Sequence, residues 1–128
     1  MKPTNRKRKV KAVKAEATRL HSKIVRQLKG PRCQNCDRVA TDCAHIVGRV
    51  FSHTRTDVNN AFALCAQCHR HFTNWHGDWM DFVYEKIGRN AYGALVNKAR
   101  AGVGVSLDWY SELDRLKVYA EKTGVSWP

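Results

Sequence analysis

Four of the five cysteines in this chain fall into two pairs of the same spacing. Cys33 and Cys36 form one Cys-x-x-Cys pair, and Cys65 and Cys68 form the second. Each pair can place two thiolates on one metal ion, and two pairs complete the tetrahedral, all-thiolate shell that a structural zinc prefers. Such a shell leaves no open position, so the predicted zinc stabilises the fold and takes no part in chemistry. An iron–sulfur centre is the alternative. The fifth cysteine, Cys43, belongs to neither pair. It is either a small packing residue or a competitor for a ligand position.

Three further polar residues stand near these pairs. His45 lies in an apolar stretch that is expected to form a strand. Asn60 stands five residues before the second cysteine pair, and His69 directly follows that pair at the start of a predicted helix. Taken singly, the three have structural interpretations, as a core histidine, a turn residue and a helix-start residue. Their combination with two cysteine pairs indicates a catalytic site.

The order and spacing of these residues resemble the HNH nucleases, also called ββα-metal or His-Me finger nucleases, in their zinc-knuckle form. The resemblance covers about residues 32–72. It implies a β-hairpin and a helix that hold one divalent metal, Mg²⁺ or Mn²⁺. By resemblance, His45 would be the general base, Asn60 would hold the hairpin loop, and His69 would bind the catalytic metal. A neutral imidazole can take the proton of an attacking water near pH 7, which is what phosphodiester hydrolysis needs.

The chain departs from the family pattern at Ala44, because many members carry an Asp or His there as a second metal ligand. Water and substrate could complete the metal shell, or another residue could substitute. The candidates for that substitution are Asp42, Asp57, His71 and His76. His53, His71 and His76 are otherwise interpreted as surface histidines.

The segments that follow the motif resemble a narrower group, the phage recombination nucleases of the NinG/Rap kind. The matching segments begin at Trp79 and Trp109. That group also places a small residue before the first histidine and an arginine soon after it, as Ala44 and Arg49 do here. It usually has Asn where this chain has His69. The resemblance implies a phage-encoded enzyme that acts on branched recombination intermediates.

The charge of the chain is concentrated at its start. Lys and Arg number 23 against 11 Asp and Glu, a formal net charge of +12. Residues 1–32 hold 12 of the basic residues and a single acid, Glu16. A basic segment joined to a nearly neutral body is typical of nucleic-acid binding through phosphate neutralisation. The residues expected to contact DNA are Lys7, Arg8, Lys9 and Lys11, with Arg49 and Arg55 in the loop between His45 and Asn60.

The hydrophobic pattern divides the chain into four parts. Residues 1–11 are too polar to pack and predict a flexible basic arm. Residues 12–31 predict a basic helix with one apolar stripe, ended by Gly30 and Pro31. Residues 32–77 form the predicted zinc and nuclease core. Residues 78–128 form a helical C-terminal part of the same domain, with helices over 78–88, 90–100 and 107–122, the last capped by Ser106. The expected fold class is α+β and mainly helical.

These features together favour a metal-dependent DNA endonuclease that cuts duplex or branched DNA. A homodimer is one form expected of such an enzyme. A non-catalytic zinc module that binds nucleic acid is the alternative, and an RNA-binding or ribosome-associated zinc protein is a third interpretation. The chain has no apolar run of membrane-spanning length and no secretory signal, so we expect it in the cytoplasm of a bacterial host cell.

Overall fold

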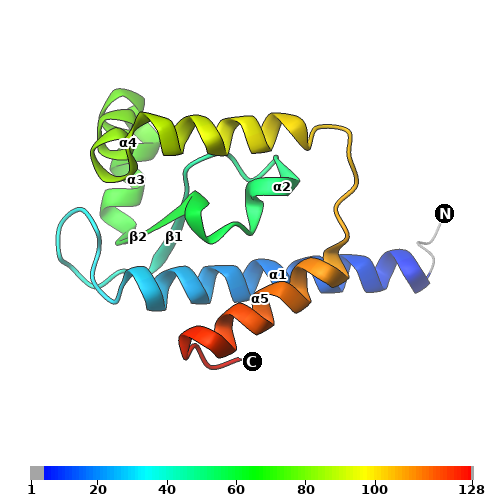
Figure 1. Cartoon of the computed structure of the whole chain (residues 1–128). Coiled ribbons are helices and arrows are strands. Elements are labelled where there is room, and N and C mark those ends of the chain that lie inside the picture. Colours follow the sequence, from blue (N-terminus) through cyan, green and yellow to red (C-terminus); the bar gives the residue numbers. More distant parts are fainter. Residues whose placement is uncertain (1–4, 128) are drawn as a thin grey trace.

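A computed structural model describes the backbone of residues 5–127 and the side chains of residues 9–127. The described chain is mainly helical, with one two-stranded sheet (Figure 1). Its elements in chain order are α1 (Asn5–Lys29), β1 (Asp42–His45), α2 (Ser52–Arg55), η1 (Val58–Asn60), β2 (Ala61–Leu64), α3 (Ala66–Asn74), α4 (His76–Ala101) and α5 (Trp109–Thr123).

Helix α1 is longer than its apolar pattern predicts. It begins at Asn5, so residues 5–11 are helical and the prediction of a flexible arm is wrong for them. Lysine and arginine favour helix almost as well as leucine does, and Val10 packs against the α1–α5 core, which extends the helix toward its N-terminus. Lys9 and Lys11 are exposed on this helix. The predicted contacts of Lys7 and Arg8 lie outside the described side chains.

The predicted apolar stripe of α1 packs against α5. Ala17, Leu20 and Ile24 are fully buried, and they meet Leu113 and Leu116 of α5. Figure 1 shows α5 crossing α1 along one side of the molecule. Helix α1 ends at Lys29, directly before the Gly-Pro pair that was expected to stop it. The stripe therefore fixes the basic helix to the body of the protein.

The sheet lies between α1 on one side and α3 and α4 on the other (Figure 1). Strands β1 and β2 pair antiparallel, with His45 opposite Ala61. Val25 of α1 packs on Ala61 and Ala63. On the other face, Phe62 belongs to the core that contains Phe72 of α3 and aromatic residues of α4. The hairpin is therefore held from both sides, and α3 follows it directly.

The C-terminal helices follow the predicted pattern with two differences. The expected helices over 78–88 and 90–100 form one element, α4, which is kinked at Gly88, where φ is 81°. This left-handed conformation suits glycine because it has no Cβ. Helix α5 is capped by Asp108 and not by the predicted Ser106. The Asp108 carboxylate accepts hydrogen bonds from the N–H groups of Tyr110 and Ser111, which stabilises the positive end of the helix.

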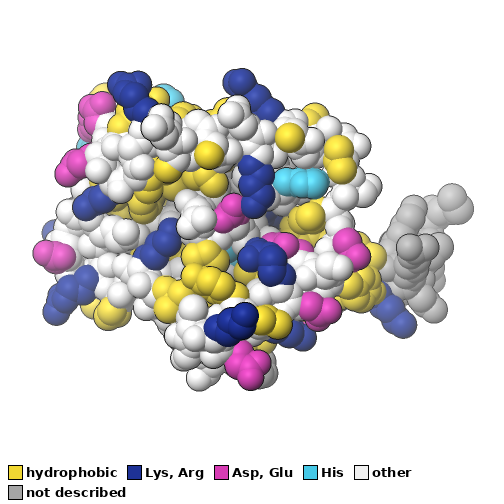
Figure 2. All heavy atoms as spheres, in the orientation of Figure 1, with side chains coloured by type: hydrophobic (Ala, Val, Ile, Leu, Met, Phe, Trp, Pro, Cys, Tyr) yellow, Lys and Arg dark blue, Asp and Glu magenta, His cyan; other side chains and the backbone are white. Residues whose placement is uncertain are grey.

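The surface charge is mixed on the face shown in Figure 2. Lys and Arg side chains stand apart there, with Asp and Glu side chains between them. Among the described residues, no helix is both long and apolar enough to cross a membrane.

Candidate functional site: a four-cysteine centre and a basic groove

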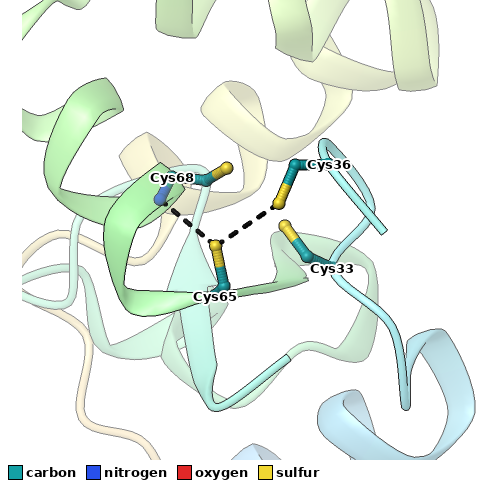
Figure 3. Close-up of side chains that lie close together, drawn as sticks. All are labelled: Cys33, Cys36, Cys65 and Cys68. Atoms are coloured by element: carbon teal, nitrogen blue, oxygen red, sulfur yellow. Dashed lines mark hydrogen bonds between the residues drawn. The ribbon is translucent and has the colours of Figure 1, made fainter. Parts of the chain in front are cut away.

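The two cysteine pairs meet in space as their spacing predicts. Cys33 and Cys36 come from the loop after α1, and Cys65 and Cys68 come from the start of α3 (Figure 3). Their four sulfur atoms lie within 4.8 Å of one another. The sulfurs of Cys36 and Cys65 are 3.6 Å apart, close to the roughly 3.8 Å between two thiolates on one tetrahedral zinc. The cluster is therefore compatible with a zinc site.

Backbone and side-chain N–H groups surround the sulfurs in the way that thiolate ligands require. Cys65 caps α3, and its sulfur accepts from the N–H of Cys68 at 3.4 Å. This hydrogen bond is the largest of several that together lower the pKa of the Cys65 thiol to about 7. Asn35 donates its backbone N–H to Cys33 and its side-chain N–H to Cys68. Such bonds stabilise negative sulfur, although burial raises the pKa of Cys68, the neighbour of Cys65 in the cluster.

Cys43 does not belong to this cluster. It is half-buried on β1, its sulfur lies 3.9 Å from the Nδ1 of His21 on α1, and burial raises the pKa of its thiol to about 11. The structure thus answers one question left open by the sequence, because Cys43 does not compete for a position among the four cysteines.

His45 ends β1 as a half-buried imidazole. Its Nε2 donates to the backbone carbonyl of Arg55 at 2.8 Å. Because a carbonyl only accepts, Nε2 carries the proton and Nδ1 keeps its lone pair. Burial lowers the pKa of His45, and the positive charges of Arg49 and Arg55 lower it further. The ring is therefore neutral near pH 7 and has one nitrogen free to accept a proton.

His69, in the first turn of α3, contacts Asp42 at the start of β1. The Nδ1 of His69 and the Oδ2 of Asp42 are 2.9 Å apart, and both side chains are about one-third to two-fifths exposed. Burial alone would raise the pKa of Asp42, but hydrogen bonds from His69 and Thr41 bring it below its ordinary value. Asp42 is therefore a carboxylate, and the pair offers a nitrogen and an oxygen to a cation.

The other proposed substitutes for a ligand at position 44 differ in their distance from the site. Ala44 itself is buried in the core. Asp57 accepts from the backbone N–H of Asn59 and pairs with Lys98. His71 and His76 are exposed, as their surface interpretation predicts. His71 contacts Asp78, whereas His76 lines a cavity of about 220 Å³ together with His45 and His69. His53 is half-buried and bonds the carbonyl of Val105. Asp42 is the candidate whose side chain pairs with His69.

Asn60 is fully buried and holds the loop that joins β1 to η1. Its Oδ1 accepts from the N–H of Val47 at 2.7 Å. Its Nδ2 donates to the carbonyls of Val47 and Thr54, each at 3.0 Å. Three hydrogen bonds from one side chain fix both ends of this loop. Because Arg55 directly follows Thr54, these hydrogen bonds also fix the Arg55 carbonyl, which orients His45.

A groove of about 530 Å³ joins these residues to the basic face of α1. Helix α1 contributes Arg19, Lys23 and Arg26, and the loop after β1 contributes Arg49. We call this the basic groove; its lining also includes Asp42, Cys43, His45, His69 and Trp127. The Lys23 ammonium lies 5.7 Å from the centre of the Trp127 ring, within cation–π range. The groove therefore has four basic side chains, one carboxylate and two histidines in its lining.

The two arginines predicted to contact DNA differ in their surroundings. Arg49 is exposed and lines the basic groove. Arg55 is half-buried and donates from Nη1 to the carbonyl of Arg49. Its Nε is buried and has no hydrogen-bond partner among the described residues. Burial lowers the pKa of Arg55, with Arg49 as a second cause. Arg49 therefore presents its side chain to the groove, whereas Arg55 is held within the loop.

Sequence reasoning missed two residues of this region, His21 and Trp127, and one contact between residues that it had named. His21 is fully buried on α1 and donates to the carbonyl of Asp57. Its position directly after Leu20 on the apolar stripe is the signal that marks it as a buried polar group. The contact of Trp127 with the groove depends on the turn after α5, and the pairing of the candidate ligand Asp42 with His69 depends on how the hairpin docks on α3. Neither of these two has a local signal in the sequence.

Comparison of the chain with protein-family models, with curated proteins and with solved structures finds no match. A function for this chain therefore has to be argued from the groove and the residues around it.

Proposed function

We propose that this chain is a metal-dependent DNA endonuclease of the HNH type, with a structural zinc on its four cysteines. The observation that carries the proposal is that His45 and His69 line the same basic groove. One presents a free imidazole lone pair, and the other presents a nitrogen beside a carboxylate. The order of hairpin and helix that brings them together also matches the ββα arrangement that the sequence resemblance implies.

DNA is the proposed substrate because the groove matches a phosphate backbone in charge and in form. The α1 residues Arg19, Lys23 and Arg26 follow at intervals of four and three, so they lie along one face of the helix. A line of cations leading to a histidine pair suits a strand whose charges repeat along its length. Duplex and branched DNA both present such a strand, and two copies of the chain related by symmetry would suit a junction.

In the proposed reaction, His45 is the general base. A water attacks the phosphorus in line, an O–P bond forms, and the P–O bond to the leaving oxygen breaks. The Nδ1 of His45 accepts the proton of that water, and the leaving oxygen takes a proton from solvent. The carbonyl of Arg55 holds the ring through Nε2, so the ring is oriented before the substrate arrives.

His69 and Asp42 fit a divalent cation. Their facing nitrogen and oxygen are 2.9 Å apart, and two adjacent ligands of an octahedral ion at about 2.1 Å would be about 3 Å apart. The contact is a hydrogen bond when no ion is bound. A bound Mg²⁺ or Mn²⁺ would neutralise charge on the phosphate oxygens. Asp42 would thus take the place of the ligand that Ala44 lacks.

Asn60 and Arg49 have supporting roles in this proposal. Asn60 fixes the loop whose carbonyl orients His45, so it positions the base without touching the substrate. Arg49 stands in the groove wall, where its guanidinium can hold a phosphate beside His45.

The proposal is tested by incubating zinc-loaded protein with supercoiled plasmid and with a synthetic four-way junction, in Mg²⁺, in Mn²⁺ and in EDTA. We expect metal-dependent nicking, and Asp42→Asn and His69→Ala should weaken Mn²⁺ binding measured by calorimetry by at least tenfold. Preference for the junction would support the narrower resemblance to recombination nucleases. DNA binding without cleavage in either metal would favour the non-catalytic zinc module, and tighter binding to RNA of equal length would favour the third interpretation.

A further inference from the structure

A second group of metal-ligating side chains lies behind the general base. His21 of α1 and the β1 residues Cys43 and His45 each have one donor atom within 4.8 Å of the others. The Nδ1 of His21 is 3.9 Å from the sulfur of Cys43, and the centres of the two imidazole rings are 5.2 Å apart. Cys43 and His45 are two apart on β1, so they share the strand face that α1 covers.

Both histidines of this group are held in the way that metal-binding histidines are held. His21 donates Nε2–H to the carbonyl of Asp57 at 2.9 Å, and His45 donates Nε2–H to the carbonyl of Arg55 at 2.8 Å. Each bond fixes the ring and leaves Nδ1 unprotonated, as backbone carbonyls do for the ligands of many metal sites. The two acceptors come from one short segment, residues 55–57, which the loop hydrogen bonds of Asn60 hold in place.

The donor set selects the kind of ion. Two imidazole nitrogens and one thiolate suit zinc or copper(I), whereas Mg²⁺ prefers oxygen. A nitrogen and a sulfur on one tetrahedral zinc lie about 3.6 Å apart, so the 3.9 Å between His21 and Cys43 needs only a small movement. His21 is fully buried, while Cys43 and His45 line the basic groove, so an ion can enter from the groove and keep a water as its fourth ligand.

We propose that His21, Cys43 and His45 form a second metal site for a thiophilic ion such as zinc, and that its occupation inhibits the enzyme. On binding, the Cys43 thiol releases its proton to solvent and the thiolate bonds to the ion. The lone pair of His45 is then engaged by the ion and cannot accept a proton from water. The site itself does not depend on the nuclease proposal, but the inhibition rests on it.

The site is tested with the full chain carrying zinc in its four-cysteine centre, titrated with Co²⁺. Thiolate-bound Co²⁺ gives a near-ultraviolet charge-transfer band. We expect one further equivalent of Co²⁺ with such a band in the wild type, loss of that band in Cys43→Ser, and at least tenfold weaker binding in His21→Gln. Exchange of Co²⁺ into the four-cysteine centre would give the same band in every protein. A band of equal strength in wild type and Cys43→Ser would therefore overturn the proposal.

Inhibition is measured separately by plasmid nicking in Mg²⁺ with increasing zinc. Each protein is compared with its own zinc-free rate, and circular dichroism checks that each variant is folded. Half-inhibition of Cys43→Ser should need at least tenfold more zinc than half-inhibition of the wild type. Equal sensitivity would refute the inhibitory role. If the chain cuts no DNA, the nuclease proposal and with it the inhibition fail, while the Co²⁺ titration still decides whether the site exists.

Discussion

Acidification should destabilise this fold through His21. This imidazole is fully buried, and burial lowers its pKa from 6.5 to about 4, an effect that the hydrogen bond to the Asp57 carbonyl only partly offsets. The unfolded chain therefore takes up a proton near pH 6.5, whereas the folded chain does not until about pH 4. The stability that depends on neutral His21 is complete above pH 6.5 and is lost as the pH falls toward 4.

The size of this effect follows from the difference between the two pKa values. A difference of about 2.5 units corresponds to about 3 kcal/mol in total, because each unit is worth about 1.36 kcal/mol. Between pH 7 and pH 5 the loss should be about 2 kcal/mol. Small domains have only about 5–15 kcal/mol of stability, so this loss is large enough to measure.

The assay is urea unfolding at pH 7, 6 and 5, followed by the fluorescence of the four tryptophans, in the wild type and in His21→Gln. Protonation of the zinc ligands also destabilises the fold in acid, but it does so equally in both proteins. The stability of the variant should therefore fall less steeply, by about 2 kcal/mol between pH 7 and pH 5. Parallel pH dependences in the two proteins would refute the reasoning.

Three further predictions follow from the same contacts. Asn60→Ala removes three buried hydrogen bonds and should lower the free energy of unfolding, measured in urea, by about 2–4 kcal/mol. A loss below about 1 kcal/mol would show that the loop does not depend on these hydrogen bonds. When the three basic residues that α1 contributes to the groove are replaced by glutamine, DNA binding should depend less on salt. The slope of the logarithm of the binding constant against the logarithm of the salt concentration should decrease in magnitude by about 2–3. Replacing Arg38, Arg100 and Lys122, exposed residues outside the groove, is the matched control, and an equal effect would contradict the groove as the binding site. Burial and two arginines lower the pKa of His45, so the rate of cleavage should stay constant down to about pH 6.5 and fall only below it; a pH–rate profile that falls already above pH 7 would exclude this base.

Local patterns in the sequence were enough to predict much of the framework. The apolar stripe of α1, its end before Gly30, the strand that holds His45 and the presence of a helix around His69 all follow from short-range spacing, although that helix begins at Ala66. The two cysteine pairs were expected to meet, and they do. Glycine at position 88 was expected to end a helix, and its positive φ kinks α4 there. Each of these features is decided within a few residues along the chain.

The features that sequence reasoning missed depend on contacts between distant segments. Polarity suggested a mobile arm over residues 1–11, because the support that Val10 finds on the α1–α5 core is invisible locally. Ser106 and Asp108 are both good helix caps, and only the packing of the last helix selects Asp108. The pairing of Asp42 with His69 depends on how the hairpin docks on α3.

The central claim is that His45 is the base of a DNA-cutting site, and one comparison tests it most directly. His45→Ala and His53→Ala each remove one imidazole, the first from the basic groove and the second from a place outside it. Single-turnover cleavage and DNA binding are measured for both variants beside the wild type. The account predicts that His45→Ala cuts at least a hundredfold more slowly and binds DNA as the wild type does, while His53→Ala cuts at the wild-type rate. Cleavage by His45→Ala at the wild-type rate would contradict it.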